Sequence, residues 1–155
     1  MAVALTLLAD VRWRGAPVTG ERSRALLAAL AQAGGRPVPD ERLVELVWGD
    51  DPPANPQKAL QVLVSRTRAA LGPDAIAREP AGYRLGVGPD EVDSGRLAAL
   101  VREAAAALDA DPAAARARAQ EALALAADAA APNGDGALLA ALRADAAGHA
   151  AAARA

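Results

Sequence analysis

The sequence predicts an α+β fold in which a small antiparallel sheet, three helices and a β-hairpin precede an all-α segment. Three observations support this prediction. The first nineteen residues have the alternation and turn residues of short strands, and residues 20–72 have the period of capped helices. After residue 92 the composition shifts to alanine, which favours helix.

The N-terminal residues are expected to form short strands. "VALTLL" is apolar and tolerant of β-structure, and "VRWR" alternates with a period of two. "GAP" is a turn sequence that separates this run from "VT". Trp13, and Trp48 further along the chain, are most simply core residues.

Two helices are expected next. In "GERSRALLAALAQAGG" the leucines fall on one side, and a Gly-Gly pair ends the helix. In "PDERLVELVWG" Pro39 suits the first turn, two acidic residues oppose the positive end of the helix dipole, and Gly49 ends the helix. "DDPPA" is then a rigid turn, because proline cannot continue a helix.

The third helix, "NPQKALQVLVSRTRAALG", is the best marked in the chain. Asn55 is a favourable N-cap, Pro56 occupies the first helical position, and Gly72 ends the helix. At 100° per residue one sector is apolar and consists of Leu60, Leu63, Val64, Thr67 and Leu71. The opposite half is polar, with Arg66 at its edge, and contains Gln57, Lys58, Gln61, Ser65 and Arg68.

A hairpin and a helical extension complete the chain. In "AIAREPAGYRLGV" two short extended runs flank Pro80-Ala81-Gly82. Helices are then expected over residues 93–109, 112–130 and 137–153, separated by Asp111-Pro112 and "PNGDG". The composition shift near residues 89–92 marks a predicted domain junction.

Composition narrows the class of protein. The formal net charge is -2, but residues 56–84 carry five cations and two acids, a local net charge of +3. Local sign matters more than the total for a surface that faces phosphates. The start of the chain lacks the basic region of a signal peptide, and no run approaches the roughly 20 apolar residues that span a bilayer. A soluble, cytoplasmic protein with no membrane partner is expected.

The residues of the common catalytic and metal sites are missing. There is no cysteine, and His149 is the only histidine, which excludes a His-based triad and a multi-His metal site. Asp50-Asp51 and the pair Asp109 and Asp111 lie beside prolines in turn or cap positions. The glycine-containing loops lack the lysine and spacing of nucleotide-binding loops. The chain is therefore not expected to be an enzyme, and no cofactor is implied.

Strands, three helices and a hairpin are the element order of a winged helix-turn-helix with an N-terminal sheet. "RALLAAL", "DERLVELVWGDDPP", "ALQVLVSRTRAALG" and "GYRL", in this order and spacing, resemble the SARP (antibiotic regulatory protein) family. The resemblance implies an OmpR/PhoB-type winged helix over residues 1–89. It also implies, over residues 93–155, a partial or divergent bacterial transcriptional activation domain built of tetratricopeptide-like helices.

The resemblance implies a transcriptional activator as the function. Such a protein would bind double-stranded DNA at tandem promoter repeats, one copy on each, and recruit RNA polymerase. The residues are also consistent with an alternative function. In that alternative, the winged helix and the helical hairpins form a protein–protein interaction module without sequence-specific DNA binding.

The polar half of the third helix would be the DNA-reading surface. By resemblance, Gln61 and Arg66 match base-reading positions, and their side chains suit adenine and guanine edges. The expected phosphate contacts, which set register, come from Gln57, Lys58, Ser65 and Arg68. Arg84 in "GYRL" matches an arginine that enters the adjacent minor groove, although it could equally pair with Glu79.

Overall fold

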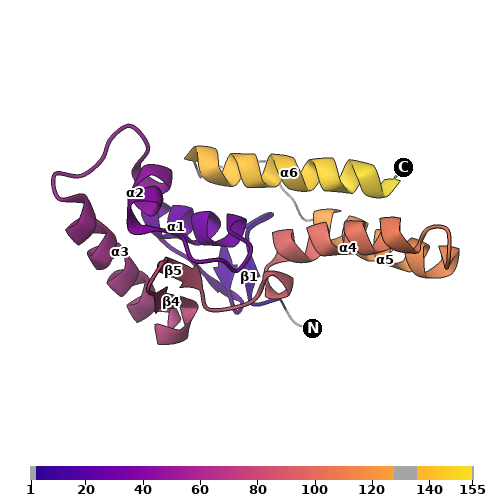
Figure 1. Cartoon of the computed structure of the whole chain (residues 1–155), viewed down its shortest axis with the longest axis horizontal. Coiled ribbons are helices and arrows are strands. Elements are labelled where there is room, and N and C mark those ends of the chain that lie inside the picture. The colour runs from indigo at the N-terminus through magenta and orange to yellow at the C-terminus, as the bar shows by residue number, and fades with distance from the viewer. Residues whose placement is uncertain (1–2, 128–135, 155) are drawn as a thin grey trace.

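The structure is a computed structural model of the 155-residue chain, and it describes residues 3–127 and 136–154 (Figure 1). Its strands are β1 (Leu5–Thr6), β2 (Arg12–Trp13), β3 (Ala16–Pro17), β4 (Ile76–Glu79) and β5 (Gly82–Leu85). Its α-helices are α1 (Glu21–Gln32), α2 (Asp40–Trp48), α3 (Pro56–Leu71), α4 (Asp93–Ala107), α5 (Pro112–Ala127) and α6 (Gly136–Arg154). Two 3-10 turns, η1 (Pro73–Ala75) and η2 (Pro89–Glu91), precede β4 and α4. The predicted α+β class, with small antiparallel sheets and a helical extension, is confirmed.

The N-terminal sheet is antiparallel, in the order β1-β2-β3. Leu5 pairs with Trp13, and Trp13 pairs with Ala16. Arg14 and Gly15 both have positive φ, at 48° and 85°, which lets two residues connect β2 to β3. The predicted short strands are present, and Trp13 is buried as expected.

The first two helices lie close to their predicted positions. Pro39 occupies the N-cap of α2 rather than its first turn, and the C-caps of α1 and α2 are Ala33 and Gly49. Trp48 packs against the core as expected but is only half-buried: it ends α2, and the guanidinium of Arg22 lies 5.5 Å from the centre of its ring.

The hairpin of β4 and β5 is attached to the helices by a third extended segment. Tyr83 forms an antiparallel bridge with Val38, in which Val38 N donates to Tyr83 O at 2.7 Å and Tyr83 N to Val38 O at 3.1 Å. Gly82 lies against this segment with φ +146°, and a Cβ placed on it would lie 2.0 Å from the carbonyl oxygen of Val38. Only glycine fits this approach.

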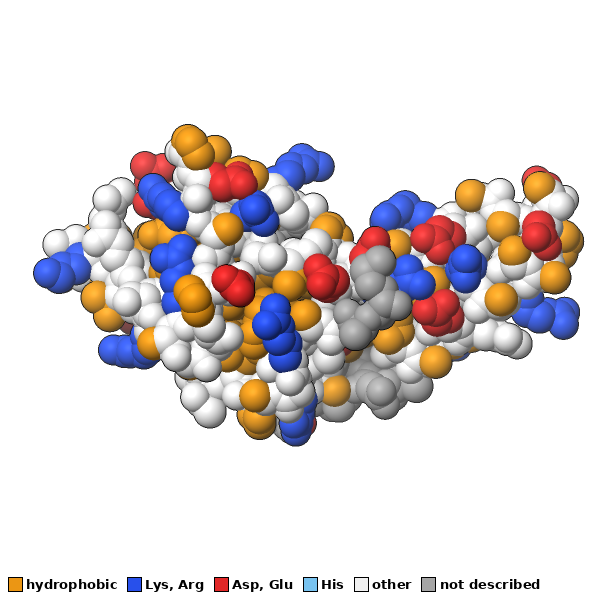
Figure 2. Space-filling model, turned by 90° about the horizontal axis from the view of Figure 1, so that it is seen from below, with side chains coloured by type: hydrophobic (Ala, Val, Ile, Leu, Met, Phe, Trp, Pro, Cys, Tyr) orange, Lys and Arg blue, Asp and Glu red, His pale blue; other side chains and the backbone are white. Residues whose placement is uncertain are grey.

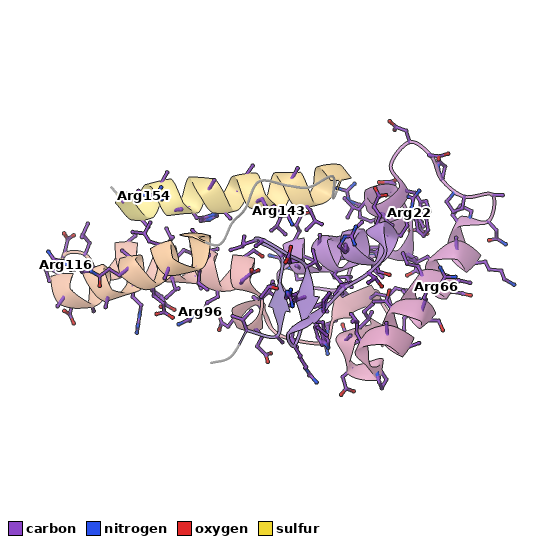
Figure 3. The ribbon with its side chains drawn as sticks, turned by 180° about the vertical axis from the view of Figure 1, so that it is seen from behind. Arg22, Arg66, Arg96, Arg116, Arg143 and Arg154 are labelled. Carbon is purple, nitrogen blue, oxygen red and sulfur yellow. The ribbon has the colours of Figure 1, made fainter. Side chains whose placement is uncertain are left out.

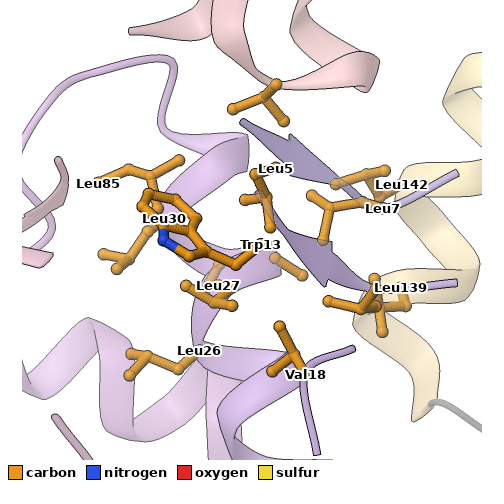
Figure 4. Packing of buried hydrophobic residues seen from close by; sticks show 14 of the residues in the cluster. Leu5, Leu7, Trp13, Val18, Leu26, Leu27, Leu30, Leu85, Leu139 and Leu142 are labelled. Carbon is orange, nitrogen blue, oxygen red and sulfur yellow. The ribbon is translucent and has the colours of Figure 1, made fainter. Parts of the chain in front are cut away.

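The helical extension shares one hydrophobic core with the winged helix. Leu139 and Leu142 of α6 are buried in the cluster that contains Trp13 and the α1 leucines (Figure 4). Figure 1 shows why: α6 runs back along α4 and α5 and reaches over α1. The helix α3 lies at the end of the molecule that is opposite to the C-terminus. The core therefore crosses the predicted junction between residues 1–89 and 93–155.

The predicted limits of the three helices in the extension can be compared with the structure only where it describes the chain. Residues 93–109 and 137–153 correspond to α4 and α6. The side chain of Asp111 accepts from Ala114 N at 3.1 Å, so its expected capping position is confirmed. The predicted end of the middle helix at residue 130 and most of "PNGDG" lie outside the described residues, as does the side chain of Leu138. No described helix is both long and apolar enough to cross a bilayer.

Two buried charged residues clamp the segment after β1. Asp93 accepts backbone hydrogen bonds from Leu7 N at 2.9 Å, Leu8 N at 3.1 Å and Ser94 N at 2.8 Å. Arg143 of α6 donates through Nε to Leu7 O at 3.0 Å, and through a second guanidinium nitrogen to Ala9 O. This segment is thereby tied to both α4 and α6.

Asp93→Asn is expected to lower the free energy of unfolding near neutral pH. The replacement amide puts an N–H group against one of the backbone N–H donors, and such a buried unpaired group costs about 1–3 kcal/mol. Chemical denaturation of the variant and the wild type measures the loss.

The same pair of proteins has a defined pH dependence. Burial raises the pKa of the Asp93 carboxyl above its ordinary 3.8, although the amide donors and Arg143 oppose the rise. On acidification the folded wild type therefore takes up this proton before the unfolded chain does, and it gains stability as pH falls through the raised pKa. The stability gap to Asp93→Asn should widen towards about pH 4; a constant gap contradicts the assignment.

Candidate nucleic-acid interface

The start of α3 is set by local signals that the sequence contains. The side chain of Asn55 accepts from Lys58 N at 3.2 Å, and Pro56 takes the first helical position. These residues confirm the predicted N-cap and first turn. They place the free, positive end of the helix dipole at the turn that follows α2.

The inner side of α3 packs against α1 and α2. Leu60, Leu63 and Val64 are buried, as the apolar sector predicted. Thr67 is also buried: its hydroxyl donates to Leu63 O at 2.8 Å and lies 3.1 Å from the Ser23 hydroxyl of α1. Because the inner side is held by packing and by a polar contact, the direction of the outer side is fixed relative to the core.

The outer side of α3 presents polar side chains in two neighbouring columns at i, i+4 spacing. Gln57, Gln61 and Ser65 form one column, and all three are exposed. Lys58 and Arg66 belong to the other and are exposed too, with Val62 between them. Five of the seven predicted site residues thus share one surface, which we call the outer face of α3: Gln57, Lys58, Gln61, Ser65 and Arg66. Figure 3 places Arg66 at the end of the molecule far from Arg116 and Arg154.

Arg68 lies apart from that group. Its Nε donates to Ile76 O at 3.0 Å, and its guanidinium lies 5.8 Å from the centre of the Tyr83 ring. Arg78 lies over the same ring at 4.5 Å and donates to Asp40 of α2 at 2.6 Å. The ring of Tyr83 therefore has two arginines within cation–π distance, and these contacts join α3, the hairpin and α2.

Arg84 forms the ion pair that the sequence left open. Its Nε donates to Glu79 Oε1 at 2.6 Å, and its NH1 donates to Leu85 O at 3.1 Å. Both partners are partly exposed, with side-chain exposures of 37% and 36%. The β4–β5 hairpin is the wing of the winged helix. Its Arg84 is thus already paired within the hairpin, at a surface that a ligand can reach.

Two shallow hollows flank the outer face of α3. One runs along the helix and is lined by Lys58, Gln61, Val62, Ser65, Arg66 and Ala69. The other lies towards α2 and has a mainly apolar lining that includes Trp48, Pro53, Ala59 and Val62, with Arg22, Lys58 and Arg66 among its other residues. Figure 2 shows Lys and Arg side chains together with Asp and Glu side chains on both the α3 end and the helical extension.

Comparison with known proteins agrees with this geometry. Residues 18–85 match the family described as "Transcriptional regulatory protein, C terminal". These residues belong to that family. The match runs from the end of the N-terminal sheet through α3 to β5, so it covers the helices and the hairpin that form the candidate interface.

Curated relatives narrow the family further. Regulatory protein AfsR of Streptomyces griseus is 36% identical over 88 residues, which are 54% of this chain and 9% of that protein. Transcriptional regulator RedD of Streptomyces coelicolor is 35% identical over 111 residues, 66% of this chain and 32% of the relative. Both are SARP-family regulators, so the resemblance to that family is confirmed.

A solved structure shows the same fold. EmbR of Mycobacterium tuberculosis, in complex with a low affinity phosphopeptide, superposes with a TM-score of 0.75 at 24% identity and covers 98% of this chain. The similarity includes the helical extension as well as the winged helix. This chain spans 43% of the EmbR chain and at most 32% of the two curated relatives.

Proposed function

We propose that this protein binds double-stranded DNA in a sequence-specific way and regulates transcription as an activator. It would bind tandem repeats in a promoter, with one copy on each repeat, and recruit RNA polymerase. On this proposal it acts in the cytoplasm, where bacterial DNA lies, and it is not an enzyme. Residues 1–89 would be the DNA-binding domain and residues 93–155 a partial or divergent bacterial transcriptional activation domain.

One observation carries the proposal: the outer face of α3 is polar, exposed and unused by the fold. Among the residues that the structure describes, none of its five side chains makes a hydrogen bond or an ion pair. Packing of the inner side fixes the direction in which the outer face of α3 points. A helix inserted in the major groove needs such a face, with cations beside the base-reading groups.

The residues then divide by chemistry. Gln61 offers a donor and an acceptor to an adenine edge, and Arg66 offers a two-pronged donor to guanine. Gln57, Lys58 and Ser65 would contact phosphates and set register. Arg68 would have a different main role, because it is held against the hairpin. It would orient the wing, and a contact with phosphate would be a second role of the same side chain.

Selection from a random duplex pool tests the proposal. A repeated motif should be enriched, and affinity for it should fall steeply with salt, because each phosphate contact releases counterions. Weak, salt-sensitive binding with no enriched motif would overturn sequence-specific recognition. That result would favour the rival protein–protein interaction module.

Glu79→Gln is expected to tighten DNA binding by about three- to tenfold at low salt. The change frees Arg84 from its ion pair and removes a negative charge from the surface that would meet the backbone. Titration of a labelled duplex measures the gain, and Arg84→Ala alone should weaken binding.

The double variant separates the two causes. With Arg84→Ala present, the gain from Glu79→Gln should shrink, because no arginine is left to release. An equal gain in both backgrounds would mean that Glu79 acts only through its charge, and Arg84 would lose its assignment to the minor groove.

A further inference from the structure

An apolar side chain interrupts the polar outer face of α3. Val62 is 45% exposed, and the only other exposed large hydrophobic side chain among the described residues is that of Leu108. Val62 follows Gln61 in the chain and lies between Lys58 and Arg66 in the i, i+4 column. It is therefore central to the face that would enter the groove.

The fold itself gives no reason for valine at this position. The buried sector of α3 points the other way and already contains Leu60, Leu63 and Val64. A β-branched residue also loses χ1 freedom in a helix, so an exposed helical position favours alanine, glutamate or lysine. The hydrophobic group is thus presented to the surface at some cost in helix stability.

The surroundings of Val62 indicate what it meets. Val62 lines both of the hollows beside α3 and thus stands as a ridge between them. Lys58 and Arg66 line both hollows too, and Arg22 lines the one towards α2. Cations around an apolar side chain are complementary to a ligand that has negative groups at its edges and an apolar group at its centre. The major groove of DNA has this arrangement, with phosphates along its edges and thymine methyl groups on its floor.

We infer that Val62 reads thymine by packing on its C5-methyl group. This inference rests on the proposed DNA binding. Thymine alone among the four bases presents a methyl group in the major groove, and apolar side chains recognise it there. This thymine would lie between the bases read by Gln61 and Arg66. Val62 would therefore specify a third base of the site, through apolar contact with its methyl group instead of hydrogen bonds.

Deoxyuridine provides the test, because it differs from thymidine in that major-groove edge only by the missing methyl group. The motif selected by the wild type should contain a thymine within the contacted half-site. Replacing that thymine by uracil should weaken wild-type binding about fourfold, the effect of one buried methylene-sized group.

Val62→Ala isolates the contact. Alanine is the better helix former, so α3 should persist, which circular dichroism verifies. The variant should bind the thymine and uracil duplexes equally, whereas Val62→Thr, which keeps one methyl group and the shape, should keep part of the difference.

The outcomes separate the two proposals. If no motif is enriched, DNA recognition itself fails. If a motif is enriched but Val62→Ala keeps the same thymine-to-uracil ratio as the wild type, or no contacted thymine exists, the Val62 assignment alone is overturned. The hollow next to Trp48 would then be the better candidate for a protein contact.

Discussion

Arg66→Ala is expected to weaken binding to the selected duplex by about 1–3 kcal/mol, a loss of roughly five- to 150-fold. Arg66 is exposed on the outer face of α3, with no hydrogen bond or ion pair among the described residues. The folded protein therefore loses nothing when the side chain is removed, and the whole effect should appear in binding. Fluorescence anisotropy with a labelled duplex measures it.

A phosphate contact and a base contact predict different results for this variant. Loss of a base contact relaxes sequence preference at one position, whereas loss of a phosphate contact weakens binding to all sequences and lowers the salt slope by about one. Arg116→Ala is the matched control: it removes the same charge from α5, far from α3 (Figure 3). Equal losses in both variants would reduce Arg66 to a general electrostatic role.

Much of α3 could be predicted because its signals are local. Asn55, Pro56 and Gly72 act within one helical turn of themselves, and the apolar spacing identifies the buried side without reference to the rest of the fold. The residues of α3 that lie outside the apolar sector are then assigned to its exposed side. Five site residues could be placed on one surface for this reason.

Arg68 shows where this assignment of polar helix positions to the exposed side fails. The helical wheel assigns it to the polar half, but a polar half can face a second element of the same protein as well as solvent. The hairpin occupies that side and offers the carbonyl of Ile76 and the ring of Tyr83. Arg84 is similar, since its choice between Glu79 and DNA depends on side-chain orientation across a hairpin.

The clamp between Asp93, Arg143 and the segment after β1 had no signal in the sequence. Asp93 is 86 residues from Leu7 and Arg143 is 136 residues from it, and neither belongs to a motif. An aspartate next to a composition shift reads as a helix start, and an arginine in an alanine-rich helix reads as solvated. Asp93 does begin α4, but its carboxylate and the Arg143 guanidinium are both buried against the segment after β1, and that burial depends on how α6 folds back.

The remaining large effect concerns the wing. Gly82→Ala is expected to destabilise the protein by about 3–5 kcal/mol, because two penalties act together. A φ of +146° is strained for any residue with a Cβ, and that Cβ would lie 2.0 Å from the carbonyl oxygen of Val38. Relief requires the hairpin to separate from the Val38 segment, which breaks both bridge hydrogen bonds to Tyr83.

Gly88→Ala is the control, since Gly88 has a φ of -74° and only the Glu91 carboxylate, at 3.9 Å, lies near its added Cβ. Its midpoint of thermal unfolding should stay close to the wild-type value, while that of Gly82→Ala falls. Displacement of the hairpin also moves Tyr83 away from Arg68, so Gly82→Ala should lose wing-dependent DNA affinity even at temperatures where it is folded. A Gly82→Ala protein as stable as Gly88→Ala would show that the hairpin is not held by the Val38 segment. The assignment of Arg84 to the minor groove, which depends on the placement of the hairpin, would fail with it.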